Sequence, residues 1–433
     1  MNIMESAKAA KRASISLSAC GSELKNKALK QIAIELENKT LEIIKANTED
    51  MQRSERENLP SPLLKRLKFD ENKITDVING IESLIKLKDP VGETMSATQL
   101  DEGLELFKVA CPIGVIGVIF ESRPDALVQI STLCLKSGNA VLLKGGNEAR
   151  NTNRILTEII NNAAENTGVS SGWIQLMETR DDVSQMLKLD EYIDLIIPRG
   201  SNEFVRYIME NSNIPVLGHA DGICHCYVDE SANVQMSVDV VVDSKTQYVA
   251  VCNATETLLV HENIARDFLP ILKEKMDEKH VDLVGCDKVR DIINVGNASE
   301  QDWNTEYLDY KLSIKIVGSM IEAIDHINEY GSGHTETILS EEKENVRIFM
   351  GLVDSGNVFW NCSTRFSDGF RYGFGAEVGI STNKIHARGP VGLEGLVIYK
   401  YLMIGNGQIV ADYESGKMQY KHKTIKKQFT LDD

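Results

Sequence analysis

The first 90 residues have apolar positions that recur at the spacing of amphipathic helices. The spacing is clearest in Leu24–Ile44 and Ile74–Leu87, where Lys and Glu fill many of the intervening positions. Residues 94–110 change to an alternation of apolar and polar positions, which is typical of strands. The pattern therefore predicts a helical region followed by a pair of strands.

From Gly114 onward, short apolar runs rich in β-branched residues alternate with stretches of helical periodicity. The runs that we expect to be strands are Gly114–Phe120, Ala140–Leu143, Ile174–Leu176, Ile193–Ile197, Val238–Val242, Leu258–Val260, Ile314–Val317 and Thr337–Leu339. The helices expected among them include Ala126–Lys136, 151–166, Ile264–Lys275 and Met320–Tyr330. Strands that alternate with helices predict an α/β fold, in which parallel-rich sheets are covered on both faces.

A chain of 433 residues exceeds the size of one ordinary core, so two α/β domains are expected. We assign residues 1–93 and 111–228 to a first domain, and residues 229–400 to a second. Segments 94–110 and 401–433 are expected to form a small oligomerisation extension or surface segments. A homo-oligomer is expected.

Composition and charge narrow the range of functions. A formal net charge of −17 argues against nucleic-acid binding, which needs a basic surface. No apolar run approaches the roughly 18 residues of a membrane span, so no membrane partner is expected. Eight cysteines without a CxxC spacing favour a reduced, cytoplasmic protein. The first residues are basic and Ser-rich like a mitochondrial presequence, but Glu5 favours an amphipathic helix there.

The sequence has neither the standard dinucleotide-binding motif nor a convincing metal-binding motif. No GxGxxG occurs, so a nicotinamide site would need a geometry other than the standard dinucleotide fingerprint. Cys224-His225-Cys226 looks like a metal cluster, but on a strand the histidine would point away from the two cysteines. Further ligands at suitable spacing are not evident, so no metal site is predicted.

Six segments together carry a specific resemblance. They are Val118–Ala126, Lys136–Ala149, Ile193–Arg206, His219–Ala232, Lys245–His261 and Ser363–Leu396. Over nearly its whole length the chain resembles the gamma-glutamyl phosphate reductase family of the aldehyde dehydrogenase superfamily. The resemblance implies an aldehyde dehydrogenase-like fold, in which the first domain binds the cofactor and the second is the catalytic domain, and a role in proline biosynthesis. The implied reaction is the NADPH-dependent reduction of L-glutamate 5-phosphate to L-glutamate 5-semialdehyde, with release of phosphate.

The resemblance implies that Cys252 is the nucleophile and that the adjacent Asn253 is also a catalytic residue. A thiolate that attacks an acyl phosphate expels phosphate and leaves a thioester, which accepts a hydride where a carboxylate does not. His219 stands where hydrolytic aldehyde dehydrogenases have a Glu that activates water. A reductase without that Glu would protect its thioester from hydrolysis. His219 itself either does acid–base work or only packs near the site.

The oxyanion formed during the reaction needs hydrogen-bond donors. The backbone N–H of Cys252 is the expected first donor. The Asn that supplies the second donor in the superfamily is missing here, and Ser122 and Arg123 both remain candidates to replace it.

The resemblance also implies the residues that bind NADPH, which are Lys144, Gly145, Gly200, Ser201 and Glu306. Lys144 ends a strand near the expected adenosine ribose, where a cation could hold the 2′-phosphate. Gly200 and Ser201 open a helix whose N-terminus can accept the pyrophosphate, and Arg199 beside them adds positive charge. Glu306 resembles the acidic residue that binds the nicotinamide ribose.

The small-molecule substrate carries a carboxylate and a phosphate, which guanidinium groups grip well. Arg123, Arg365 and Arg371 lie in the most family-like segments and are the candidates, with Asn361 and Phe366 bordering the same pocket. Two other functions stay open: a hydrolytic aldehyde dehydrogenase and a non-catalytic binding protein of the same fold. The missing Glu counts against the first and Cys252 against the second. A glutamate 5-kinase partner is left open.

Overall fold

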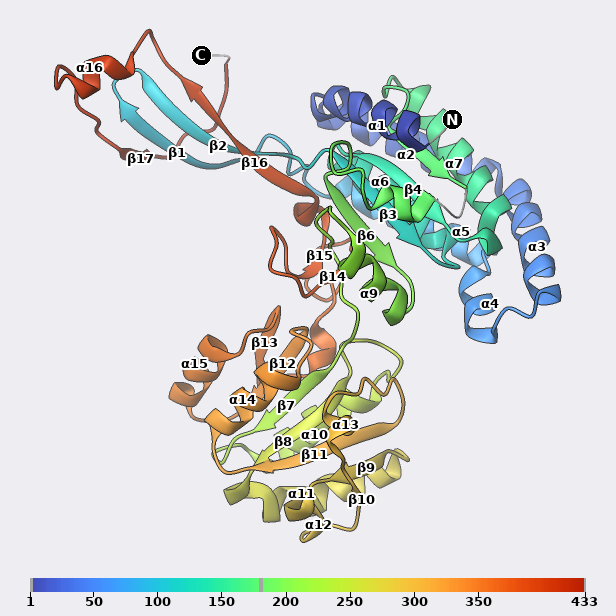
Figure 1. The fold of residues 1–433 in the computed structure, drawn as a ribbon, viewed down its shortest axis with the longest axis vertical. Coiled ribbons are helices and arrows are strands. Elements are labelled where there is room, and N and C mark those ends of the chain that lie inside the picture. Colours follow the sequence, from blue (N-terminus) through green and yellow to red (C-terminus); the bar gives the residue numbers. More distant parts are fainter. Residues whose placement is uncertain (1–2, 179–181, 432–433) are drawn as a thin grey trace.

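The computed structural model describes residues 3–178 and 182–431 (Figure 1). The N-terminal region consists of helices α1 (Ile3–Ser18), α2 (Ser22–Asn38), α3 (Thr40–Arg56), α4 (Ser61–Leu67) and α5 (Glu71–Lys86). Helix α2 buries Ala28, Leu29, Ile32 and Leu36, which share one face at helical spacing. Helix α5 begins after Asp70, whose carboxylate caps its first turn. The predicted helical character of the first 90 residues is confirmed.

The first α/β layer contains a four-stranded parallel sheet with the order β5-β4-β3-β6. Its elements are β3 (Val115–Phe120), α6 (Pro124–Lys136), β4 (Ala140–Gly145), α7 (Arg150–Glu165), β5 (Ile174–Met177), α8 (Asp182–Met186), β6 (Leu195–Arg199) and α9 (Asn202–Asn211). Ile116 and Val118 of β3 pack toward α2, α6 and α7, whereas Val115 and Ile119 pack toward α1. Burial on both faces explains why β3 is apolar throughout.

The second α/β layer contains a seven-stranded sheet with the order β10-β9-β11-β8-β7-β12-β13, in which every neighbouring pair is parallel. The strands are β7 (Cys224–Val228), β8 (Thr255–His261), β9 (Asp282–Gly285), β10 (Gly296–Asn297), β11 (Lys311–Val317), β12 (Thr335–Leu339) and β13 (Asn357–Trp360). The helices are α10 (Val234–Thr246), α11 (Glu262–Glu278), α12 (Asp287–Arg290), α13 (Glu300–Trp303), α14 (Met320–Tyr330) and α15 (Lys343–Leu352). Helices α10 and α11 cover one face, and α14 and α15 cover the other.

A third, antiparallel sheet projects away from both α/β layers (Figure 1). Its order is β16-β2-β1-β17, built from β1 (Thr94–Asp101), β2 (Leu104–Pro112), β16 (Val397–Ile404) and β17 (Lys423–Ile425), with α16 (Val410–Glu414) near its far end. We call this projecting sheet the arm. Near its base lies a short antiparallel pair of strands, β14 (Gly379–Ser381) and β15 (Gly389–Val391). The predicted strand pair at 94–110 is confirmed as β1 and β2.

Two sequence-based assignments were wrong. Val238–Val242 is part of helix α10 and not a strand, because a short apolar run fits a buried helix face as well as a strand. The predicted domain boundary after residue 228 placed Cys224–Val228 in the first domain, but β7 pairs with β8 and β12 of the second sheet. In the part of the chain that the structure describes, no helix has the length and apolarity to cross a membrane.

Candidate active site

Cys252 lies in the turn between α10 and β8, and its side chain is half-buried. Gly222 packs directly against this turn. A Cβ at residue 222 would lie 2.1 Å from the carbonyl oxygen of Cys252 and 2.4 Å from its Cα. Any side chain at this position would displace the turn, so Gly222 is needed for the close approach of the two backbones.

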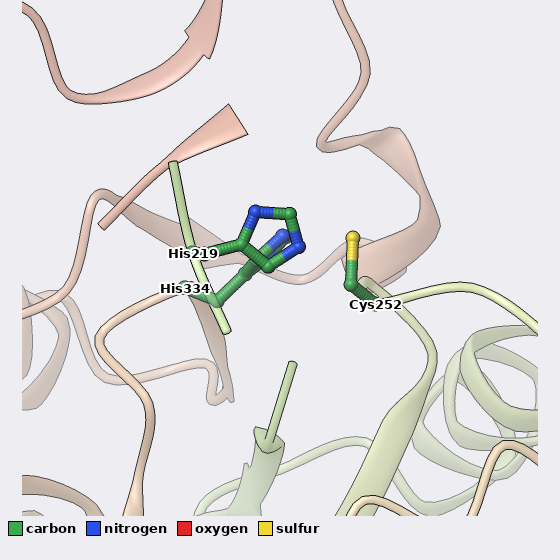
Figure 2. A group of neighbouring side chains, drawn as sticks. All are labelled: His219, Cys252 and His334. Atoms are coloured by element: carbon green, nitrogen blue, oxygen red, sulfur yellow. The ribbon is translucent and has the colours of Figure 1, made fainter. Parts of the chain in front are cut away.

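Cys252, His219 and His334 converge at one point (Figure 2). The sulfur and one nitrogen of each ring all lie within 4.8 Å of one another. His219 precedes β7, Cys252 precedes β8 and His334 precedes β12, and these three strands are neighbours in the seven-stranded sheet. The sheet topology therefore assembles the group from three distant parts of the sequence. Its sulfur and nitrogen atoms suit either nucleophile chemistry or a soft metal ion.

His219 is oriented by the backbone, with its Nδ1 3.1 Å from the carbonyl oxygen of Ile380. Because a carbonyl oxygen can only accept, Nδ1 carries the hydrogen in this contact and Nε2 keeps a lone pair. Figure 2 shows the ring nitrogen farther from the backbone turned toward the Cys252 sulfur. Burial lowers the pKa of His219, so its ring is neutral near pH 7. This geometry lets His219 accept a proton from the thiol.

The surroundings of Cys252 keep its thiol protonated at rest. Burial raises the pKa of Cys252 to about 12, and the charges of Glu306 and Glu377 act in the same direction. The guanidinium of Arg199 opposes this shift. Attack by the sulfur therefore requires the proton to leave for a nearby base, and His219 offers one.

His334 is the member of this group that sequence reasoning missed. It is fully buried, and its Nδ1 lies 2.8 Å from the hydroxyl of Thr335. Its Nε2 has no hydrogen-bond partner among the described residues. Burial, and secondarily the charge of His219, lowers the pKa of His334, so this ring is also neutral. The segment around His334 has no catalytic motif that could have revealed it.

A buried ion pair supports the Cys252 turn from below. Lys245, near the end of α10, lies 2.5 Å from Glu256, near the start of β8, and neither side chain is exposed. The pair therefore joins the two ends of the turn. The second oxygen of Glu256 accepts a hydrogen bond from the backbone N–H of Leu308 at 3.3 Å, which ties in the segment that carries Glu306.

Glu306 links the two α/β layers. Its Oε2 accepts a hydrogen bond from the side-chain amide of Asn202 at 2.5 Å, and it also bonds the backbone N–H of Gly222. Burial raises its pKa above the ordinary value for a glutamate. Glu306 thus joins the N-terminal end of α9 to the segment that packs against Cys252.

The predicted substrate arginines Arg365 and Arg371 lie side by side. The side chain of Arg371 donates to the backbone carbonyl of Arg365, and the Nε of Arg365 donates to Gln247 at 3.0 Å. The Arg365 charge lies close enough to act on the Cys252 thiol. Asn253 donates to the carbonyl of Ser367 at 2.7 Å, so it fastens the Cys252 turn to the same segment.

The remaining predicted residues, Asn361, Phe366 and Ser122, differ in their surroundings. Asn361 both accepts from and donates to the backbone of Ser340, at 2.9 and 3.1 Å. Phe366 is 53% exposed. The N–H and hydroxyl of Ser122 both donate to Glu148, at 2.6 and 3.0 Å, which turns them away from a role as oxyanion donors. For Asn361 and Phe366, substrate contact stays a prediction.

Two of the predicted cofactor residues border a cavity of about 240 Å³ between β4 and α9, whereas Gly200 lines a neighbouring cavity. Lys144 and Gly145 line it, and Lys144 Nζ donates to the Gly145 carbonyl at 2.6 Å. A Cβ at Gly145 or at Gly200 would collide with neighbouring side chains, at 2.2 and 2.7 Å. These bare backbone positions and the cation fit a nicotinamide dinucleotide. A pyrophosphate at the N-terminus of α9 would replace Glu121, which accepts from the Ser201 N–H at 3.3 Å.

Comparison with known proteins identifies the family of this chain. A family model described as the aldehyde dehydrogenase family matches residues 1–301. A gamma-glutamyl phosphate reductase of Acetivibrio thermocellus is 69% identical over 431 residues, covering 100% of both chains. One of Nostoc punctiforme is 52% identical, covering 96% of each chain. The crystal structure of a gamma-glutamyl phosphate reductase from Thermotoga maritima superposes with a TM-score of 0.92 at 41% identity, covering 94% of this chain and 100% of that one.

The chain therefore belongs to the aldehyde dehydrogenase family and, within it, to the gamma-glutamyl phosphate reductases, which are oxidoreductases. The expected fold class is confirmed by the same comparisons. Members of the family use NAD or NADP, and a structure of glyceraldehyde-3-phosphate dehydrogenase from Methanocaldococcus jannaschii with NADP shares the fold at 16% identity and a TM-score of 0.61.

Proposed function

We propose that this chain reduces L-glutamate 5-phosphate to L-glutamate 5-semialdehyde with NADPH, through a thioester on Cys252, as a step of proline biosynthesis. The observation that carries the proposal is the half-buried Cys252 thiol with a neutral histidine ring and two arginine charges, Arg199 and Arg365, around it. An acyl phosphate needs this set: a nucleophile, a base for its proton, and cations for the anionic groups.

In the proposed mechanism, Nε2 of His219 accepts the thiol proton as the Cys252 sulfur attacks the acyl carbon. The backbone N–H of Cys252 supports the oxyanion, and the bond from carbon to the phosphate oxygen breaks. NADPH, when bound, would supply the hydride that reduces the thioester. The carbon–sulfur bond then breaks to release the aldehyde, and His219 returns its proton to the Cys252 sulfur. No carboxylate occupies the position of His219, so water activation there is weak and the thioester persists.

Different side chains would bind the substrate and the cofactor. Arg365 and Arg371 would hold the carboxylate of the glutamyl group, since their segment is fastened to the Cys252 turn through Asn253. Lys144 would hold the 2′-phosphate of NADPH, because it is the cation of the cavity next to the bare glycines. Glu306, bonded to Asn202, would hold the nicotinamide ribose.

The arm is the proposed subunit contact of a homo-oligomer. Its strand β16 exposes Tyr401 and Met403, with 61% and 58% of each residue accessible. Large apolar side chains in a row on a projecting strand are typical of interfaces. A cytoplasmic location fits eight cysteines that are all free. The proposal extends to a glutamate 5-kinase partner, because direct transfer between the two enzymes would protect the unstable acyl phosphate from water.

The reverse reaction tests this function. The protein is mixed with glutamate 5-semialdehyde and NADP⁺, and NADPH formation is followed with and without inorganic phosphate. Phosphate-dependent turnover is expected. Steady turnover that ignores phosphate would instead identify a hydrolytic aldehyde dehydrogenase.

A further inference from the structure

A second cavity, of about 180 Å³, lies beside the nucleophile and holds three guanidinium groups. Its lining includes Arg66 of α4, Arg123 before α6, Arg199 at the end of β6, and His219. His219 also belongs to the Cys252 group, so the cavity adjoins the reacting sulfur. Three positive side chains around a small space next to the nucleophile suit a compact anion with more than one charge.

Arg199 is the unusual member of this set. Within residues 3–178 and 182–431, its side chain has no ion pair or hydrogen bond, whereas Arg123 pairs with Asp125 at 3.1 Å. Its guanidinium packs against Gly379, where a Cβ would lie 2.8 Å from Nη1. Glu377 and Asp125 are the carboxylates whose charges reach it. A largely buried guanidinium without a bonded partner is costly unless an anion joins it during the reaction.

We propose that Arg199, with Arg123 and Arg66, binds the phosphate of the acyl phosphate and, in the reverse direction, inorganic phosphate. This inference rests on the proposed function and names the site of its leaving group. In the forward direction the sulfur–carbon bond forms while the carbon–oxygen bond breaks, and the electron pair leaves with the phosphate oxygen. In the reverse direction a phosphate oxygen attacks the thioester carbon, and the carbon–sulfur pair returns to Cys252.

The planar guanidinium of Arg199 can donate two hydrogen bonds to this phosphate and stabilise the charge that develops as it departs. The competing occupant is the cofactor pyrophosphate, because Gly200 at the N-terminus of α9 lines the same cavity. The two occupants differ in an observable way. A residue that binds phosphate changes the KM for phosphate, whereas one that binds pyrophosphate changes the KM for NADP⁺.

The test compares Arg199→Met with Arg154→Met, an arginine of α7 that pairs with Glu178 away from the cavity. The KM values for inorganic phosphate and for NADP⁺ are measured in the reverse reaction. Arg199→Met is expected to raise the KM for phosphate about 10- to 100-fold, the loss of charged hydrogen bonds, with the KM for NADP⁺ changed less than about twofold. Arg199→Lys keeps the charge but not the planar donor pair, so its KM for phosphate should lie between those of wild type and Arg199→Met.

Calorimetric titration of inorganic phosphate into the protein without substrate gives an independent readout. Wild type and Arg154→Met should bind phosphate, and Arg199→Met should bind it at least about tenfold more weakly. An unchanged KM and binding of phosphate in Arg199→Met would overturn the inference, as would a parallel rise in the KM for NADP⁺. Wild-type turnover that does not depend on phosphate would refute the proposed function instead. Titration that detects no phosphate binding to wild type would overturn the inference directly.

Discussion

The two parallel sheets present their functional residues from opposite edges. In the four-stranded sheet, Lys144 lies at the carboxyl end of β4 and Arg199 at the carboxyl end of β6. In the seven-stranded sheet, His219, Cys252 and His334 precede the amino ends of their strands. The carboxyl edge of a parallel sheet is the usual place for a ligand, because loops and helix N-termini gather there. In the seven-stranded sheet the catalytic residues instead lie at the amino ends of the strands.

Each edge is held in a different way. At the amino edge of the seven-stranded sheet, the segments Thr255–Thr257 and Thr335–Thr337 both read Thr-Glu-Thr and are fully buried. Their glutamates pair with Lys245 at 2.5 Å and with His225 at 3.0 Å. The carboxyl edge of the first sheet relies on close backbone packing at glycines and on the start of α9. The ends of the strands under the nucleophile are therefore held by a buried ion pair and a buried histidine–glutamate contact, whereas those under the cofactor are held by close backbone packing.

The largest expected effect comes from removing the nucleophile at the amino edge. Cys252→Ser should lower kcat/KM at least about 10⁴-fold in both directions, because an ester accepts hydride more poorly than a thioester and a hydroxyl is harder to ionise. Cys362→Ala is the matched control and should stay within about twofold. Steady-state rates decide; a dead Cys362→Ala beside an active Cys252→Ser would assign the wrong thiol.

The buried pair beneath the nucleophile should dominate stability. Burial raises the pKa of Glu256 to about 7 even beside Lys245, so in Lys245→Met the unpaired carboxyl must take up a proton to stay buried, and at pH 8 the free energy of unfolding should fall by about 3–5 kcal/mol. The double variant Lys245→Met/Glu256→Leu should recover most of this loss, since no buried charge remains. Denaturant unfolding curves measure both. A loss below about 1 kcal/mol in the single variant would mean that the amino edge does not depend on its ion pair.

His219 should contribute less than Cys252. His219→Asn keeps a donor for the Ile380 carbonyl but offers no base for the thiol proton. Its kcat should fall about 100-fold, the usual size of general-base catalysis, while the KM for phosphate changes little. Rates near those of wild type would show that His219 only packs, and that the thiol proton leaves by another route.

The reactivity of the thiol gives a smaller, pH-dependent effect. Because burial and the charges of Glu306 and Glu377 raise the pKa of Cys252 to about 12, alkylation by iodoacetamide should keep rising from pH 7 to beyond pH 10. Glu306→Gln removes a negative charge, which lowers this pKa and should speed alkylation at pH 8 by up to about tenfold. Peptide mass spectrometry identifies the modified cysteine, and the exposed Glu329→Gln serves as control. Slower alkylation in Glu306→Gln would reverse the assigned sign.

At the carboxyl edge of the first sheet, Lys144→Ala should weaken NADPH about tenfold more than NADH, because only NADPH carries the 2′-phosphate. Binding of each cofactor can be followed by fluorescence titration without substrate. An equal loss of affinity for both cofactors would mean that Lys144 lines the cavity without binding the 2′-phosphate.

The contrast between the two edges also explains what could be predicted from the sequence. The strands and helices of the first α/β region follow from apolar periodicity, whereas the role expected for Lys144 comes from the family resemblance and Arg199 enters only as a charge beside Gly200. The run Val238–Val242 was wrong as a strand because burial of one helix face leaves the same pattern. Cys252 and His219 were reached through family resemblance, since neither residue sits in a motif with a physical signature of its own.

The remaining features depend on contacts between distant segments. His334 meets Cys252 only because β12 is placed beside β7, an order that the sequence does not reveal. The Lys245–Glu256 pair spans a turn, and a lysine and a glutamate in polar–apolar context look like ordinary surface residues. Ser122 is a candidate oxyanion donor by its place in the sequence, but its N–H and hydroxyl donate to Glu148, a contact that the sequence does not reveal.

The most direct test of the account is to look for the acyl group on the nucleophile. The protein is mixed with glutamate 5-semialdehyde and NADP⁺ without phosphate, digested, and mapped by mass spectrometry. One glutamyl group should appear on the peptide that contains Cys252, disappear when phosphate is added before quenching, and be missing in Cys252→Ser. Turnover with no adduct on Cys252, or an adduct on another residue, would contradict the covalent mechanism.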